Sequence, residues 1–126
     1  MNDYGSARSI YQDAAHATRS AKDMEYAVLG RLSHALRKAA DQRETNFPAF
    51  ADAVARNLSF WSIVATDVSS PENRLPSELR QRLFWLSEFV RVESGRALRG
   101  TAEVEPLVEI NMSLMQGLRP KPDIGT

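Results

Sequence analysis

The chain contains no cysteine and carries no net charge, and each absence excludes a class of function. Without cysteine there is no disulfide, no thiolate metal ligand and no cysteine nucleophile. The 16 basic and 16 acidic residues balance, so no overall field would concentrate nucleic acid or an anionic membrane at the surface. A protein is the more natural partner for such a chain.

Catalytic and membrane-spanning motifs are also missing from the sequence. The two histidines, His16 and His34, form no HExxH pair, and no acidic cluster has the spacing of metal ligands. Neither a glycine-rich phosphate loop nor a GxSxG motif occurs. The start of the chain does not resemble a secretory signal, and no run of about eighteen apolar residues is present. We therefore expect a cytoplasmic protein that is no enzyme, needs no cofactor and does not insert into a membrane.

Arginine supplies thirteen of the sixteen basic residues, which would suit contacts with phosphates and bases. The arginines are interleaved with acidic residues, however: Arg80 and Arg82 are flanked by Glu78 and Glu88. A nucleic-acid footprint gathers charge of one sign on one face. The pattern instead indicates a solvated face with local ion pairs, so nucleic acid is not the favoured partner.

The apolar residues of the sequence recur with the period of an α-helix. Apolar residues recur at spacings of three and four, and no segment alternates long enough for a strand. Asp23 is predicted to begin the second helix, Asn46 to cap the third, Gly100 to end the fourth and Gly117 to end the fifth. Gly30 marks either a close helix crossing or a weak exposed turn. The pattern predicts an all-α, single-domain compact bundle of about five helices, at residues 6–17, 23–42, 47–68, 76–99 and 104–117.

One helical domain is expected over residues 1–118, because no internal repeat or linker divides the chain. Residues 119–126 are rich in proline and polar side chains, so we expect them to form a flexible tail.

The connection between the third and fourth helices has the most specific local sequence. Pro71 should stop the third helix, since it pushes the preceding residue out of the helical region. Pro76 should start the fourth, where its missing N–H is no loss. Between them Asn73 suits a tight turn and Leu75 offers an apolar anchor ahead of the helix. The connection is therefore predicted to fold onto the body of the protein.

Two asparagines fall within apolar stripes. An unpaired buried amide would cost about 1–3 kcal/mol, so Asn57 and Asn111 are predicted to hydrogen-bond across helices or to the connection at 71–76. Asp67 could cap backbone N–H groups in that connection. Arg80 could pair with Asp67 or with a carboxylate of a partner.

The fourth helix is apolar over more than one face. Leu79 heads one row of aliphatic residues, while Phe84, Trp85 and Phe89 point to neighbouring angles. These aromatic residues either pack against two neighbouring helices at once or form a groove for an amphipathic partner helix. Phe60 is also either a packing residue or a partner-binding residue. Adjacent residues of a helix point in different directions, so Phe60 and its neighbour Trp61 cannot both point into the core. The predicted partner-binding residues are Phe60, Phe84, Trp85 and Phe89, with Arg82 or Arg91 at the rim.

The order and spacing of several of these residues resemble the FlaF family of flagellar biosynthesis regulators. The matching positions are, in order, Asn57, Trp61, Asp67, the run Pro71-Glu72-Asn73-Arg74-Leu75-Pro76, Leu79, Arg80, Glu109-Ile110-Asn111 and Gly117-Leu118. The resemblance implies a role in flagellum assembly. It implies a protein that binds flagellin as an adaptor or secretion chaperone, promotes flagellin synthesis and export, and acts with FlbT and the flagellar export apparatus.

Two other functions stay open at this point. A regulator of flagellin mRNA translation, acting directly or through FlbT, would need an arginine-lined stripe and would bind with a strong salt dependence. A purely structural module that stabilises FlbT or the export gate would have no affinity for flagellin. The same apolar surface could also support a homodimer.

Overall fold

The computed structural model describes the backbone of residues 15–118 and the side chains of residues 25–117. This part of the chain forms the helices α2 (Ala15–Ala40), α3 (Phe47–Ser69), α4 (Ser77–Leu98) and α5 (Glu105–Leu118), with no strand. The predicted all-α bundle is confirmed. No helix within these residues has the length and apolar character needed to span a bilayer. The predicted tail and most of the predicted first helix lie outside the described residues.

The start of α2 differs from the prediction. Asp23 does not begin this helix, because the helical backbone runs unbroken from Ala15 through Asp23 to Ala40. Residues 15–17, which were expected in the first helix, therefore belong to α2. An aspartate favours a helix start by only about 1 kcal/mol, and residues 17–22 contain neither glycine nor proline to interrupt the helix.

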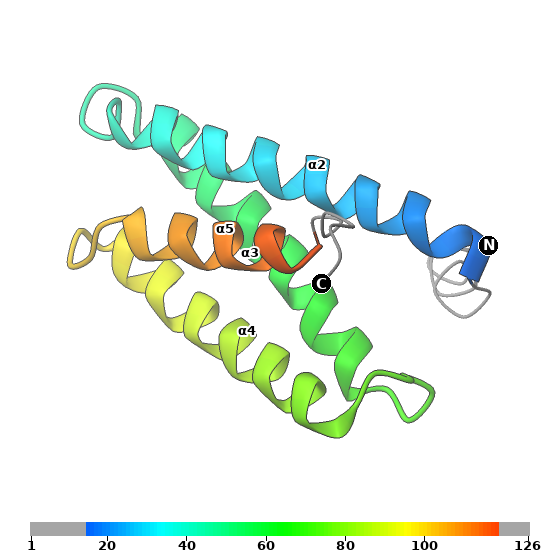
Figure 1. Cartoon of the computed structure of the whole chain (residues 1–126). Coiled ribbons are helices and arrows are strands. Elements are labelled where there is room, and N and C mark those ends of the chain that lie inside the picture. The colour runs from blue at the N-terminus through cyan, green and yellow to red at the C-terminus, as the bar shows by residue number, and fades with distance from the viewer. Residues whose placement is uncertain (1–14, 119–126) are drawn as a thin grey trace, which may run out of the picture.

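The four helices are arranged so that α4 lies at the edge of the bundle. In Figure 1, α2 and α5 lie side by side, and α3 crosses behind α5 and links α2 to α4. Helix α4 packs mainly on α3 and diverges from α5 beyond the loop at 99–104 that joins them. The backbones of α2 and α4 do not come close to each other within the described residues. One long side of α4 is therefore left without a neighbouring helix.

All four helices contribute to one hydrophobic core. Its fully buried members include Leu36 of α2, Trp61 of α3, Val90 of α4 and Leu107 of α5. Burying a side chain of this size stabilises the fold by about 1.5–3 kcal/mol. Gly30 is half-buried where α2 meets α5, and a Cβ there would lie 3.6 Å from Met115 Cε. Gly30 thus marks a helix contact, one with room for a methyl group.

Local signals in the sequence set most of the helix ends. The Oδ1 of Asn46 accepts a hydrogen bond from the Ala49 N–H at 3.2 Å, which confirms the predicted cap of α3. Gly100 follows α4 with φ of +83°, a conformation that glycine adopts without strain. Pro76 occupies the N-cap position just before α4 and not its first turn. Gly117 is still helical, since α5 reaches Leu118.

An arginine in the loop after α2 fastens the C-terminal end of α4. Arg43 Nη2 donates to the carbonyl oxygens of Ala97 at 3.4 Å and Leu98 at 3.1 Å. Its guanidinium carbon also lies 5.4 Å and 5.2 Å from the ring centroids of Phe47 and Phe50. A cation is favourable at the negative end of a helix, so Arg43 ties α4 to the start of α3.

Candidate functional site

A buried polar network joins α3 to α5. Trp61 Nε1 donates to Asn111 Oδ1 at 2.8 Å, and Asn111 Nδ2 donates to Asn57 Oδ1 at 2.8 Å. All three side chains are fully buried. The predicted hydrogen bonding of Asn57 and Asn111 across helices is confirmed, and the indole N–H of Trp61 is a partner that the sequence did not reveal. These residues set the architecture of the core and are not available to a partner.

The connection between α3 and α4 folds on itself around Asn73. Its Nδ2 donates to the carbonyl oxygen of Asp67 at 3.1 Å and to Asp67 Oδ2 at 3.3 Å, and its Oδ1 accepts from the Leu75 N–H at 3.0 Å. Asn73 therefore forms the predicted turn. The carboxylate of Asp67 accepts a hydrogen bond from this amide side chain, and its suggested capping of backbone N–H groups stays a prediction. Pro71 and Leu75 are exposed.

A carboxyl group of α2 faces the same end of α3. Burial raises the pKa of Glu25 from 4.5 to about 7, and the negative charge of Asp67 adds to the shift. Desolvation penalises the ionised form of a carboxyl group, and a second carboxylate nearby does the same. Glu25 is therefore largely protonated in mildly acidic solution. The sequence gives no sign of this, because it depends on how α2 crosses α3.

The inner face of α4 is unusually polar. Ser87, Glu93 and Ser94 are buried together with Val90 and Ala97. Ser87 Oγ donates to the Leu83 carbonyl oxygen at 2.9 Å, whereas Ser94 Oγ has no hydrogen-bond partner among the described residues. Small serines let α4 lie close to α3, but they supply little apolar burial.

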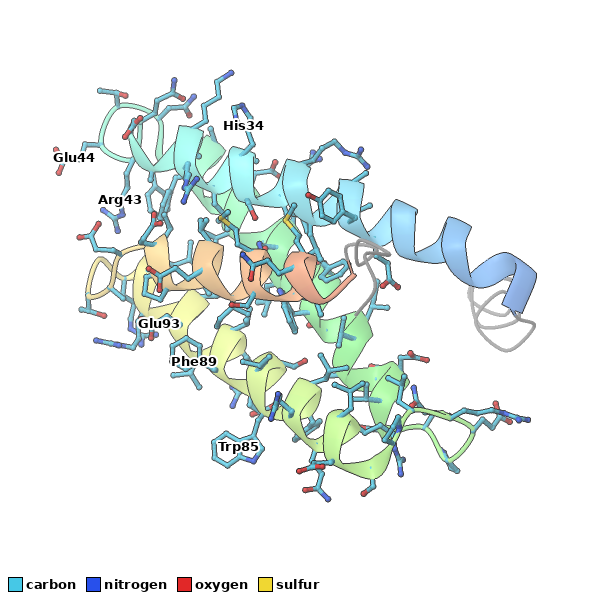
Figure 2. All side chains as sticks on the ribbon, viewed as in Figure 1. His34, Arg43, Glu44, Trp85, Phe89 and Glu93 are labelled. Carbon is cyan, nitrogen blue, oxygen red and sulfur yellow. The ribbon has the colours of Figure 1, made fainter. Side chains whose placement is uncertain are left out.

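The outer face of α4 is unusually apolar. Trp85, Phe89 and Val92 are 75%, 42% and 50% exposed. They stand at positions i, i+4 and i+7, which fall on one side of a helix, and we refer to these three residues as the α4 stripe. Figure 2 shows Trp85 projecting from α4 away from α2 and α5, with Phe89 along the same edge. Contiguous exposed apolar residues of this kind are typical of an interaction surface.

A groove adjoins the α4 stripe where the end of α3 meets the first half of α4. We call it the α3–α4 groove, and it is lined by Val68, Ser69, Ser77, Arg80, Gln81, Phe84 and Trp85. Phe84 is 42% exposed here, and Trp85 belongs to both the groove and the stripe. Arg80 Nε is buried without a hydrogen-bond partner among the described residues. The pairing of Arg80 with Asp67 or with a carboxylate of a partner stays a prediction.

The predicted partner-binding residues fall on three different surfaces. Trp85 and Phe89 share the α4 stripe, and the exposed Arg82 lies one turn before Trp85. Phe84 and Arg91 lie on another side of α4, where Arg91 Nη2 bonds Glu88 Oε1 at 3.0 Å. The sequence reasoning missed Val92, although it stands seven residues after Trp85 and so on the same side of the helix.

Phe60 lies on α3 and is half-buried. Its ring meets that of Trp61 edge to face, with centroids 5.9 Å apart. As predicted, the two rings do not both point into the core: Trp61 is fully buried, whereas Phe60 packs at the margin of the core. A role of Phe60 in partner binding stays a prediction.

Most charged contacts of α3 and α4 are local. Arg56 pairs with Asp52, Arg91 with Glu88, and Arg96 with Glu93, each within one helical turn. Ion pairs at this spacing are worth a few tenths of a kcal/mol when exposed. The described part of α4 therefore presents mixed charge around an apolar stripe.

The chain was compared with known proteins by family, by sequence and by structure. No curated protein and no solved structure gives a significant match. The sequence model of one family, described as flagellar protein FlaF, matches residues 7–118. This range includes all of the described helices, the connection around Asn73 and the network of Trp61 and Asn111. The chain therefore belongs to the FlaF family of flagellar proteins.

Proposed function

We propose that this chain is a flagellin-binding adaptor or secretion chaperone that uses α4 as its docking surface. Membership of the FlaF family implies a role in flagellum biosynthesis. In the proposed mechanism the protein covers an amphipathic helix of flagellin, which would otherwise self-associate. It promotes flagellin synthesis and export, acts with FlbT, and keeps flagellin competent for the export apparatus. We place this action in the cytoplasm.

The observation that carries the proposal is the exposed apolar stripe on the outer face of α4, opposite an inner face that buries several polar residues. Serines and a glutamate are buried on its inner face, while Trp85, Phe89 and Val92 are exposed on its outer face. An ordinary amphipathic helix would turn its aromatic side chains inward. Exposed aromatic side chains do not stabilise the free protein. A surface that binds a partner accounts for their exposure.

The geometry of this surface suits a helix as the ligand. Trp85 and Val92 are separated by seven residues, or about 10 Å along the helix axis. Helix-binding surfaces present apolar anchors over about two turns in this way. The adjoining α3–α4 groove adds Phe84 and Arg80 to this surface. An acidic residue beside the apolar face of the bound helix would pair with Arg80.

Titration calorimetry with purified monomeric flagellin tests the proposal. We expect saturable binding that weakens at least about tenfold in Trp85→Ala and Phe89→Ala, as is usual for central aromatic anchors. Ile63→Ala is the matched control, because Ile63 is an apolar residue of α3 that is 59% exposed and lies outside the stripe. The absence of both heat and co-elution at tens of micromolar would rule out direct binding of flagellin.

The two alternative functions, a regulator of flagellin mRNA and a purely structural module, predict different results in binding measurements. A regulator of flagellin mRNA would retain that RNA with an affinity that falls steeply as salt rises, whereas burial of the apolar stripe depends little on salt. A structural module would bind FlbT or the export apparatus and give no signal with flagellin.

A further inference from the structure

The outer face of α4 has a charge pattern that is symmetric about the stripe. Glu78 stands seven residues before Trp85, and Arg96 stands seven residues after Phe89. Seven residues are close to two helical turns, so all four side chains lie on one side of α4. Glu78 and Arg96 are both exposed. Along this face the helix therefore presents an acid, two aromatic rings and a base.

We propose that the free protein pairs with a second copy of itself through this face, with the two α4 helices antiparallel. A two-fold axis at the level of Ser87, midway between Trp85 and Phe89, brings Trp85 against the partner's Phe89. The same axis brings Glu78 against the partner's Arg96. A two-fold interface must be complementary to itself, and the sequence of this face meets that condition.

The charges select this arrangement over its alternative. With the two helices parallel, Glu78 would face the partner's Glu78, and Arg96 the partner's Arg96, which is unfavourable at both ends. In the antiparallel pair Arg82 lies opposite the partner's Val92, so its aliphatic stem covers an apolar side chain while its charged end stays in water.

The contacts within one copy leave this face available. Glu78 forms no ion pair within the described residues. Arg96 donates to Glu93 Oε1 at 3.0 Å and to the Thr101 carbonyl oxygen at 3.1 Å, but a guanidinium has further N–H donors for a second carboxylate. No helix of the described chain covers the stripe.

The size of the surface indicates a weak and reversible dimer. Glu78 and Arg96 are about 27 Å apart along the helix axis, and a single helix pair of that length buries less than the roughly 800 Å² per partner of a standard stable interface. We expect dissociation in the micromolar range. The free protein forms this dimer, so dimerisation can be measured whether or not the chain binds flagellin.

Sedimentation equilibrium of the full chain, from low to high micromolar concentration, is the test. We expect a monomer–dimer equilibrium whose dissociation constant rises at least about tenfold in Trp85→Ala and in Phe89→Ala. Ile63→Ala should leave it unchanged. A chain that is monomeric at every concentration would overturn the proposal, and so would a dimer that is insensitive to the loss of Trp85.

Charge reversal then tests the antiparallel pairing. Glu78→Arg alone and Arg96→Glu alone should each weaken the dimer, because like charges then meet at both ends. The variant with both changes should dimerise as well as the unchanged chain. An equimolar mixture of the two single variants should form a heterodimer, which keeps the test decisive if the double variant folds poorly. The antiparallel arrangement is wrong if the variants are folded, as judged by their melting curves, and yet neither the double variant nor the mixture of single variants dimerises.

Discussion

The two tryptophans of this chain lie in opposite environments, and the comparison separates the folding part of the molecule from the binding part. Trp61 on α3 is fully buried, and its indole N–H is bonded to Asn111 on α5. Trp85 on α4 is 75% exposed. The difference arises from the neighbours: α3 packs against α2 and α4 and is hydrogen-bonded to α5, whereas the outer side of α4 faces no helix of the described chain. The residues around Trp61 hold the bundle together, and those around Trp85 remain available for docking.

The largest effect should come from breaking the buried network. Asn111→Ala removes both hydrogen bonds and leaves Trp61 Nε1 and Asn57 Oδ1 unpaired in the core, at about 1–3 kcal/mol for each group. We expect a loss of about 3 kcal/mol in the free energy of unfolding, measured by urea titration. Gln116→Ala, an exposed amide on the same helix, should change it by less than about 0.5 kcal/mol. Similar values for both variants would mean that the network does not stabilise the core.

A smaller effect should follow from the carboxyl group between α2 and α3. The folded-state pKa of Glu25 is raised from 4.5 to about 7. The folded state therefore holds the proton more tightly, so its contribution to stability is complete below pH 4.5 and is lost as the pH rises through about 7.

Glu25→Gln cannot ionise, so its stability should not fall over this interval. We expect the variant to exceed the unchanged chain by on the order of 1–2 kcal/mol at pH 8 and by little at pH 4.5, since one pKa unit corresponds to about 1.4 kcal/mol and solvent screens a half-buried group. Urea titrations at the two pH values provide the measurement. A constant difference between the chains at both values would show that Glu25 does not titrate in this range.

Arg43, which ties α4 to the start of α3, should contribute less to the free energy of unfolding than Glu25. Arg43→Ala removes the donors to the last carbonyl groups of α4 and the stacking on Phe47 and Phe50, for an expected loss of about 1 kcal/mol. Arg31→Ala, at an exposed position of α2, is the control. Hydrogen exchange should speed up at the C-terminal end of α4 in Arg43→Ala alone. Unchanged exchange there would mean that α3 packing by itself secures this end.

The smallest effect on folding is expected at the stripe. Trp85→Ala should alter the free energy of unfolding by less than about 0.5 kcal/mol, because little of its surface is buried within the chain. Thermal unfolding of the variant, compared with Trp61→Phe, measures the contrast. A loss of 2 kcal/mol or more for Trp85→Ala would contradict the view that the stripe is free of the fold.

The features that depend on a few neighbouring residues could be predicted from the sequence. The cap at Asn46, the turn at Asn73 and the helix end before Gly100 all follow from side chains that bond their own backbone or from the freedom of glycine. The start of α2 could not be predicted in the same way. A residue such as Asp23 favours a helix start without requiring it, and nothing nearby interrupts the helix.

Features that depend on distant segments were predicted in outline only. An amide in an apolar stripe needs a partner, which indicated the bonding of Asn57 and Asn111 but not the role of Trp61. The aromatic surplus of α4 was visible in its sequence. Which of its aromatic residues are exposed was not, because that depends on which side of α4 packs against α3. The raised pKa of Glu25 likewise depends on a helix crossing and carries no local signal.

The contrast between Trp61 and Trp85 also gives the protein two built-in fluorescent reporters. An indole in the dry core emits at shorter wavelength than one in water and is shielded from soluble quenchers such as iodide. Docking of a partner on α4 should therefore shift the emission of Trp85 to the blue and protect it from quenching while Trp61 stays unchanged. Unfolding should shift Trp61 to the red. One spectrum of the unlabelled chain can thus distinguish an occupied α4 from a folded but unoccupied one, and both from a chain that has lost its core.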